Sequence, residues 1–163
     1  MSKQIGRQQS RMPQRIVLHV EDEGEDAFFV RWAFQKAGIN CTVLRLRSGQ
    51  ECIDYLKGSG RFFERTVHPV PDLVLLDLKL PQLDGYQVLD WIRAQDEYRG
   101  LPVAVVTGCA DPGEIDKASA RGATCCFEKS PHYASVVEYV SGLFQTKPTE
   151  PLTCPGPVLQ SAS

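Results

Sequence analysis

The residues of this 163-residue chain whose side chains could do chemistry together stand directly after short apolar runs. They are Glu21 and Asp22 after "IVLHV", Asp77 within "LVLLDLKLP", Thr107 at the end of "VAVVT", and Lys129 after "CCFE". A carboxylate such as Asp77 is costly beside so many apolar residues unless a partner compensates its charge. We therefore ask which elements of the fold would bring these side chains together.

Strand-like apolar runs alternate along the chain with segments of helical length and periodicity. Strands are expected at 15–20, 41–46, 72–77, 101–107 and 123–128, and helices at 24–38, 48–58, 84–95, 111–122 and 133–144. This alternation predicts an α/β fold, a doubly wound parallel sheet of five strands with helices on both faces. Because crossover connections are right-handed, the carboxyl ends of the strands meet at one edge, where open parallel sheets bind ligands. The candidate residues all fall at that edge.

Two of the expected helices carry signals of their amino ends. Ser48 is a predicted N-cap with Glu51 three residues further on, and Asp111 is a predicted N-cap with Glu114 in the same relation. Each pair predicts a capping box, in which the two residues bond each other's backbone N–H.

The grouping of acidic side chains at one edge indicates phosphoryl chemistry. Glu21, Asp22 and Asp77 would repel one another unless one took a proton or a divalent cation joined them. Mg²⁺ suits such a set, because it binds one or two carboxylates and keeps waters that a phosphate can replace. A carboxylate can attack phosphorus to form an acyl phosphate, with charge stabilised by the metal and Lys129 and a hydrogen bond from Thr107. Asp77 is therefore predicted to carry a phosphoryl group.

Composition and patterning narrow the setting of this chemistry. The net charge of −2 argues against nucleic acid as a partner. No run approaches the ~20 apolar residues of a membrane span, and no signal-peptide pattern is present, so we expect a cytoplasmic protein without a membrane partner. The six cysteines lack zinc-ligand or C-x-x-C spacing and are expected to be reduced and mostly buried. Residues 1–14 are expected to be a basic flexible tail, 15–145 the folded domain, and 146–163 a Pro-rich disordered tail.

The segments "VEDE", "LVLLDLKLP" with "LDG", "VAVVTG" and "FEKSP", in this order and spacing, resemble the receiver domain of bacterial two-component response regulators, as in the chemotaxis regulator. The resemblance covers residues 15–144 and implies a (βα)5 flavodoxin-like fold with strand order 2-1-3-4-5. The long link before the third strand, and the lack of an output domain after the fifth helix, are similar to stand-alone regulators such as the cyanobacterial phytochrome response regulator.

This resemblance also implies roles for the candidate residues. The implied Mg²⁺ ligands are Glu21, Asp22, Asp77 and the Lys79 backbone carbonyl. Asp77 would be the phosphoacceptor, Thr107 the switch hydroxyl and Lys129 the ammonium that pairs with the phosphoryl group. The implied partner is a sensor histidine kinase or a histidine phosphotransfer protein. The protein would be a phosphoacceptor in signalling, with no enzymatic turnover beyond its own phosphorylation and dephosphorylation.

The sequence departs from the family pattern on the fifth strand. Cys126 stands where the family has its switch aromatic, and the neighbouring Phe127 should face the opposite side of the sheet. The family's Lys-Pro pair is here Lys129-Ser130-Pro131. We therefore expect a weakened signal route through this strand.

Two other functions remain open. One is a receiver-like scaffold that binds partners without being phosphorylated, which the missing aromatic would permit. The other is a hydrolase with an aspartyl-phosphate intermediate. The hydrolase is disfavoured because the acid expected two residues after the nucleophile is replaced by Lys79.

The first expected helix carries apolar residues on two sides. At 100° per residue its predicted core face consists of Phe29, Val30, Ala33, Phe34 and Ala37. Phe28 and Trp32 fall on the opposite, polar side. Exposed apolar groups often mark contacts, so these two residues would anchor either the phosphodonor protein or a second copy of the chain. The alternative is that the N-terminal tail or the long link before the third strand covers them.

Overall fold

The computed structural model describes residues 14–109, 111–130 and 133–145. The predicted tails, apart from residue 14, lie outside the described residues. The strands are β1 (Arg15–Val20), β2 (Cys41–Leu46), β3 (Leu73–Leu76), β4 (Val103–Thr107) and β5 (Cys125–Glu128). The helices are α1 (Gly24–Lys36), α2 (Gly49–Lys57), α3 (Gly85–Ala94), α4 (Pro112–Ala120) and α5 (Ala134–Gln145), with short 3-10 turns η1 (Gly60–Phe62) and η2 (Asp96–Tyr98).

The five strands form one sheet in the order β2-β1-β3-β4-β5, and every pairing is parallel. The predicted fold class and the strand order implied by the resemblance are both confirmed. The inner strands β3 and β4 are buried along their whole length, which explains why they are continuous apolar runs without alternation. The edge strand β2 is only half-buried over most of its length.

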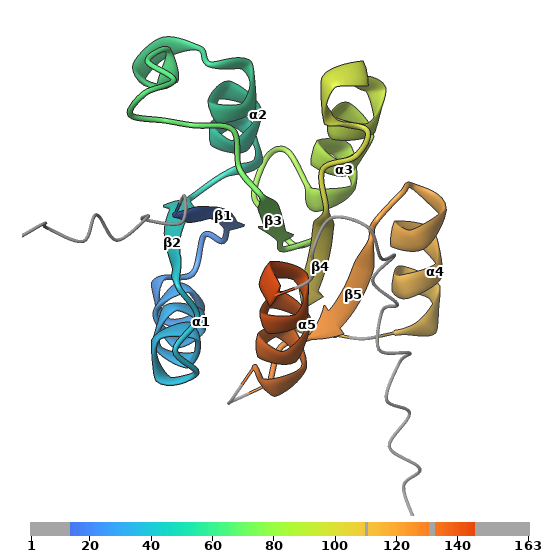
Figure 1. The fold of residues 1–163 in the computed structure, drawn as a ribbon. Coiled ribbons are helices and arrows are strands. Elements are labelled where there is room, and N and C mark those ends of the chain that lie inside the picture. Colours follow the sequence, from blue (N-terminus) through green and yellow to red (C-terminus); the bar gives the residue numbers. More distant parts are fainter. Residues whose placement is uncertain (1–13, 110, 131–132, 146–163) are drawn as a thin grey trace, which may run out of the picture.

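Helices cover both faces of the sheet (Figure 1). Side chains of α1 and α5 pack with Val17, Leu75 and Val106 on one face. Those of α2 and α3 pack with Leu18 and Leu76 on the opposite face, and Ala118 of α4 packs there against Val105 of β4. The sheet is therefore buried between two helical layers and offers a ligand only its ends.

The helix boundaries agree with the prediction within a few residues, but the predicted capping boxes do not form. Ser48 does accept from the Glu51 backbone N–H at 3.1 Å, yet the Glu51 carboxylate accepts from the Arg47 N–H at 2.7 Å. Asp111 accepts from the N–H of Gly113, two residues further on, at 3.1 Å. A complete capping box is found instead at α3, between Asp84 and Gln87.

The predicted core face of α1 is partly wrong. Of its five predicted members, Phe29 is 37% exposed and Ala37, just beyond the helix, is also exposed. The buried residues of the helix are Ala27, Val30, Ala33 and Phe34. Phe28 and Trp32 are 62% and 41% exposed, as predicted.

The link between α2 and β3 is tied to the end of α2. Arg65 donates to the carbonyls of Tyr55 and Leu56 in the last turn of α2, where the helix dipole favours a cation. Phe62 is buried, and its ring centroid lies 5.1 Å from that of Tyr55 and 5.2 Å from that of His68. The long polar link is thus an ordered part of the domain.

Among the described cysteines, Cys41, Cys52, Cys109 and Cys126 have free thiols. Cys125 is disulfide-bonded, so the prediction of reduced cysteines is wrong for this residue. No helix in the described part of the chain is long and apolar enough to cross a membrane.

Candidate functional site at the carboxyl edge of the sheet

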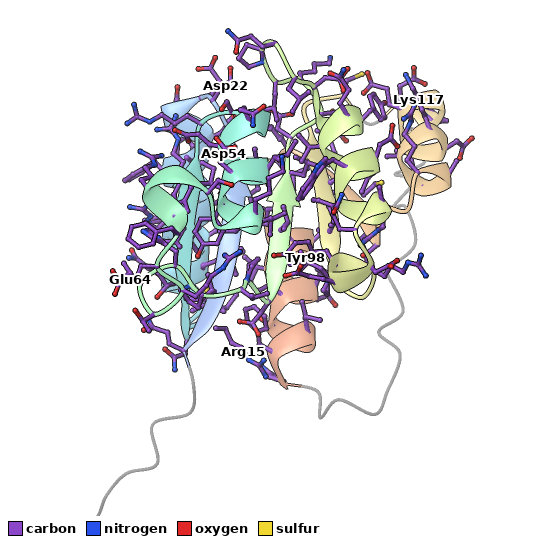
Figure 2. The ribbon with its side chains drawn as sticks, turned by 90° about the horizontal axis from the view of Figure 1, so that it is seen from above. Arg15, Asp22, Asp54, Glu64, Tyr98 and Lys117 are labelled. Atoms are coloured by element: carbon purple, nitrogen blue, oxygen red, sulfur yellow. The ribbon has the colours of Figure 1, made fainter. Side chains whose placement is uncertain are left out.

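The candidate residues lie at the carboxyl ends of the strands. Figure 2 shows Asp22 at one end of the sheet and Arg15, the first residue of β1, at the other end. Parallel pairing without large register shifts brings the ends of β1 and β3 together, since Val20 stands beside Leu76. The Asp77 N–H continues this ladder by donating to the Val20 carbonyl at 3.1 Å.

Asp77 is 4% exposed, and both of its carboxylate oxygens are engaged. Oδ1 accepts from the Lys79 N–H at 3.1 Å, and Oδ2 lies 3.1 Å from Lys129 Nζ. The chain returns past this residue so closely that a Cβ at Gly85 would lie 2.3 Å from the Asp77 carbonyl oxygen. Glycine is therefore required in "LDG", where the amino end of α3 packs against the turn that carries Asp77.

Glu21 and Asp22 complete an acidic cluster with Asp77, in which one oxygen from each residue lies within 4.8 Å of the others. Glu21 is fully buried and its Oε1 accepts from the Glu23 N–H at 3.1 Å. Burial, together with the charge of Asp77, raises the pKa of Glu21 to about 7, although Lys129 opposes this shift. An all-oxygen set with excess negative charge fits a hard divalent cation such as Mg²⁺. A bound cation would offset the repulsion between Asp77 and Glu21, which adds to the effect of burial on this pKa.

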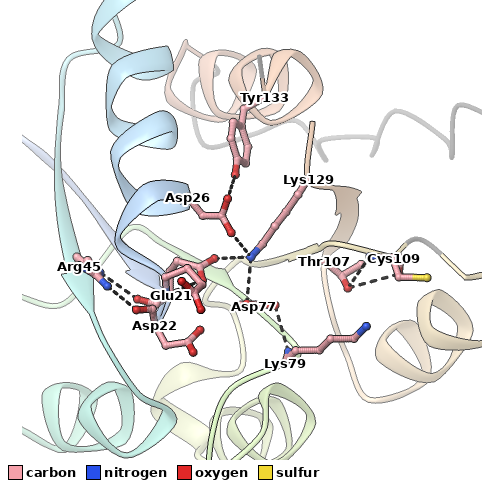
Figure 3. A network of polar contacts seen from close by, with 11 residues as sticks. Glu21, Asp22, Asp26, Arg45, Asp77, Lys79, Thr107, Cys109, Lys129 and Tyr133 are labelled. Carbon is pink, nitrogen blue, oxygen red and sulfur yellow. Dashed lines mark hydrogen bonds and ion pairs between the residues drawn. The ribbon is translucent and has the colours of Figure 1, made fainter. Parts of the chain in front are cut away.

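Lys129 follows β5, and its ammonium contacts three carboxylates (Figure 3). Nζ lies 2.7 Å from Glu21 Oε2, 2.9 Å from Asp26 Oδ2 and 3.1 Å from Asp77 Oδ2. Burial alone would lower the pKa of Lys129, but its bonds to Glu21 and Asp26 and the charge of Asp77 outweigh burial and raise it. The ammonium therefore stays charged and provides the compensation that a buried Asp77 requires.

Three residues that contact this site are absent from the sequence-based prediction. Asp26 lies in the first turn of α1, and because Asp22 precedes that helix, helical spacing from the acidic pair gives no signal for it. Arg45 of β2 donates to the backbone carbonyls of Glu21 and Asp22 at 3.0 and 2.6 Å and so holds the acidic loop. Tyr133 donates its hydroxyl to Asp26 Oδ1 at 3.4 Å. No sequence signal distinguishes Arg45 or Tyr133.

Thr107 is buried at the end of β4, but its hydroxyl is bonded within its own loop. Oγ1 donates to the Cys109 carbonyl and accepts from the Cys109 N–H, both at 3.4 Å (Figure 3). The Lys79 side chain is exposed, and only its N–H has a described bond to Asp77. The role of the Lys79 carbonyl as a metal ligand stays a prediction.

The side chains of β5 point as expected. Cys126 is half-buried on the face covered by α4, where it packs near Tyr86 of α3. Phe127 faces α5, and its ring centroid lies 5.5 Å from that of Tyr139. The aromatic ring beside α4 is thus supplied by α3, where Lys117 lies 4.2 Å and Arg121 5.6 Å from the Tyr86 ring centroid.

The doubly wound sheet with an acidic cluster and a lysine at its carboxyl edge defines a flavodoxin-like α/β domain with a site suited to a divalent cation and a phosphate. The family model of the response regulator receiver domain matches residues 17–141. The chain therefore belongs to the response regulator receiver family, as the sequence motifs indicated. Proteins of this family act in two-component signalling.

Two relatives are regulatory proteins by name. The response regulator Rcp1 of Synechocystis is 28% identical over 131 residues, which are 80% of this chain and 87% of that protein. FilR2 of Methanothrix harundinacea, a probable methanogenesis regulatory protein, is 35% identical over 106 residues, 63% of this chain and 64% of that protein. This chain thus spans less than two-thirds of FilR2.

Solved structures show the same fold. The Mn²⁺-bound form of Rcp1 has a TM-score of 0.68 at 26% identity, over 85% of this chain and 99% of that one. The phosphorylated cyanobacterial phytochrome response regulator RcpA has a TM-score of 0.69 at 27% identity, over 80% of this chain and 91% of that one. The similarity to the stand-alone phytochrome-type regulators is thereby confirmed.

Proposed function

We propose that this protein accepts a phosphoryl group from a phosphohistidine onto Asp77, in a reaction that requires Mg²⁺, and signals through protein contacts. The observation that carries the proposal is the position of the Asp77 carboxylate, 3.1 Å from Lys129 Nζ and within the acidic cluster formed with Glu21 and Asp22. Two relatives of known structure, the phosphorylated RcpA and the Mn²⁺-bound Rcp1, support both parts of it.

The residues of the site suggest how the transfer proceeds. Glu21, Asp22 and Asp77, with the Lys79 carbonyl, would hold Mg²⁺, which supplies positive charge to the phosphoryl oxygens. An oxygen of Asp77 forms the new bond to phosphorus while the bond from phosphorus to the imidazole nitrogen breaks, and that electron pair stays on the imidazole. The Lys79 N–H holds Oδ1 during this step. The Lys129 ammonium is already beside the carboxylate and can follow the charge onto a phosphoryl oxygen.

The hydroxyl of Thr107 is the group we expect to respond to the phosphoryl group. Its two bonds to Cys109 are 3.4 Å long, so exchanging them for a phosphoryl oxygen costs little. The partner that fits this chemistry is a histidine kinase or a histidine phosphotransfer protein. The proposal includes a cytoplasmic location, where the protein would meet such a kinase or phosphotransfer protein.

Incubation with Mg²⁺ and a small acyl phosphate tests the proposal. A stoichiometric adduct that is stable to acid and labile to hydroxylamine, and that forms only with the metal, is the expected result. Sustained phosphate release would instead indicate a hydrolase, and the absence of an adduct would indicate a scaffold that works without phosphorylation. Either of these outcomes overturns the proposal.

A further inference from the structure

Asp26 contacts the site without belonging to the set of carboxylates that converge for a metal. That set consists of Glu21, Asp22 and Asp77. Asp26 lies on the other side of the ammonium, with Oδ2 2.9 Å from Lys129 Nζ (Figure 3). Lys129 Nζ also contacts Glu21 and Asp77, whose charges a bound divalent cation would partly neutralise. Among the three described carboxylates around the ammonium, Asp26 would then be the one that keeps its full attraction for it.

Asp26 is itself held by Tyr133. The Tyr133 hydroxyl donates to Asp26 Oδ1 at 3.4 Å, so the two oxygens of Asp26 face a hydroxyl and an ammonium. Tyr133 is 3% exposed and packs in the core beneath α1 and α5. Burial, followed by the charge of Asp26, raises the pKa of Tyr133 to about 12, so the hydroxyl keeps its proton and remains a donor.

The backbone around Tyr133 is shaped to place this ring. Its φ of 47° lies in the left-handed region, which is costly for a residue with a Cβ. Its N–H donates to Ser130 Oγ at 3.1 Å and to the Ser130 carbonyl at 3.2 Å. Ser130 is the residue that separates Lys129 from Pro131. The serine at this departure from the family's Lys-Pro pair thus provides, through its hydroxyl, one of the two bonds that fix Tyr133.

We propose that Asp26 and Tyr133 are positioning residues that hold the Lys129 ammonium beside Asp77 when the metal is bound. This inference rests on the proposed function, because its purpose is to keep the ammonium where the phosphoryl oxygens arrive. It assigns a role to two residues on different elements, α1 and the segment before α5, that meet only in the folded protein.

Chemical labelling of Lys129 tests the positioning role of Asp26 and Tyr133 without any phosphorylation. The protein at saturating Mg²⁺ is treated with a small amine-reactive reagent, and modification of Lys129 is followed by peptide mass spectrometry. Asp26→Asn removes a charge-assisted hydrogen bond and should speed labelling about tenfold. Tyr133→Phe removes only the hydroxyl and should speed it less. Glu25→Gln is the matched control, because it removes the same charge from an exposed side chain of the same helical turn.

Phosphorylation by a small acyl phosphate gives the second readout. Asp26→Asn should slow adduct formation about tenfold, and Glu25→Gln should leave the rate unchanged. In a Lys129→Met background, Asp26→Asn should cause no further loss, since a positioning residue acts only through the lysine. A structural role would slow both backgrounds equally.

Wild-type labelling and phosphorylation rates in Asp26→Asn, or equal slowing in the two backgrounds, would overturn the inference. If neither the wild type nor any variant forms an adduct, the proposed function fails. The labelling rates alone then decide whether Asp26 and Tyr133 position Lys129.

Discussion

At the scale of single residues, the site is short of positive charge. Four carboxylates, those of Glu21, Asp22, Asp26 and Asp77, lie around the Lys129 ammonium or within the acidic cluster. One ammonium cannot neutralise four carboxylates, and the pKa of Glu21 is raised first by burial and then by the charge of Asp77. The imbalance favours binding of a divalent cation.

Asp77→Asn should abolish phosphorylation and leave the fold intact. The amide is nearly isosteric and removes one charge from a crowded cluster, while Lys129 keeps its contacts with Glu21 and Asp26. The free energy of unfolding should be unchanged or higher by about 1 kcal/mol. Label incorporation and denaturant unfolding measure the two effects, with the exposed Asp116→Asn as control. Stoichiometric label on Asp77→Asn would remove this residue as the phosphoacceptor.

Replacing Glu21 and Asp22 together by Ala should lower Mg²⁺ affinity by about a hundredfold, because two of the expected ligands are lost. The fluorescence of Trp32 or of the half-buried Trp91 provides the titration signal. Glu23→Ala with Glu25→Ala is the matched control, since both side chains are exposed in the same acidic segment. Equal affinity in the two double variants would exclude the metal role.

At the scale of elements, α1 has a function on each of its sides. Its first turn brings Asp26 to Lys129, and its buried side fills the core with Val30 and Phe34. Its outer side exposes Phe28 and Trp32, where Lys36 Nζ lies 4.7 Å from the Trp32 ring centroid. The exposed pair thus belongs to the helix that begins beside the acidic cluster.

Phe28→Ser with Trp32→Gln should slow phosphotransfer from the cognate kinase about tenfold, as expected when exposed aromatic anchors are lost. Transfer from a small acyl phosphate should be unchanged, because neither side chain has a described contact with the site. Phe63→Ser is the control, since this ring is 73% exposed on the α2–β3 link. Equal slowing with both donors, or with neither, contradicts docking at this surface, and sedimentation would reveal a dimer that uses it instead.

A second element-scale prediction concerns β5 and α4. With Cys126 in place of an aromatic ring, movement of Thr107 releases no bulky side chain on that strand. The neighbouring Tyr86 ring has two cationic contacts from α4, with Lys117 and Arg121. Amide exchange with and without a beryllium fluoride phosphoryl mimic should therefore change at residues 107–109 but little in α4, β5 and α5. A large protection change across those three elements would show that the usual route still operates.

At the scale of the whole molecule, the buried sheet imposes a pH limit on stability through His19. This β1 residue is 2% exposed, and its Nδ1 has no hydrogen-bond partner among the described residues. Burial, and next the charge of Lys129, lowers the pKa of His19 from 6.5 to about 3. The folded protein therefore excludes a proton that the unfolded chain binds below pH 6.5.

Stability contributed by neutral His19 is present above pH 6.5 and is lost as the pH falls toward 3. His19→Leu should flatten the dependence of the unfolding free energy on pH in this window by up to one proton, or about 1.4 kcal/mol per pH unit. Glu21 has the opposite effect, since its raised pKa makes stability fall as the pH rises from 4.5 to about 7, but it is present in both proteins. Denaturant unfolding without metal measures the slopes, and identical slopes would contradict the prediction.

The sequence by itself determined the sheet, its strands and the meeting of Glu21, Asp22, Asp77 and Lys129 at one edge. These features follow from local periodicity and from the rule that parallel strands end on the same side. Local sequence patterns predicted individual hydrogen bonds and the burial of individual side chains less reliably. The Glu51 carboxylate accepts from Arg47 rather than Ser48, and Phe29 lies at the border of the core although helical periodicity predicted its burial.

Only the tertiary structure decided which residues surround the acidic cluster. Asp26, Arg45 and Tyr133 come from α1, β2 and the segment before α5, and their contacts depend on how those elements pack. Tyr133 meets Asp26 across 107 positions of sequence, a separation that no periodic pattern spans. The sequence determines periodic structure because neighbours along the chain share a geometry. Bonds between distant elements depend instead on side-chain directions that packing alone sets.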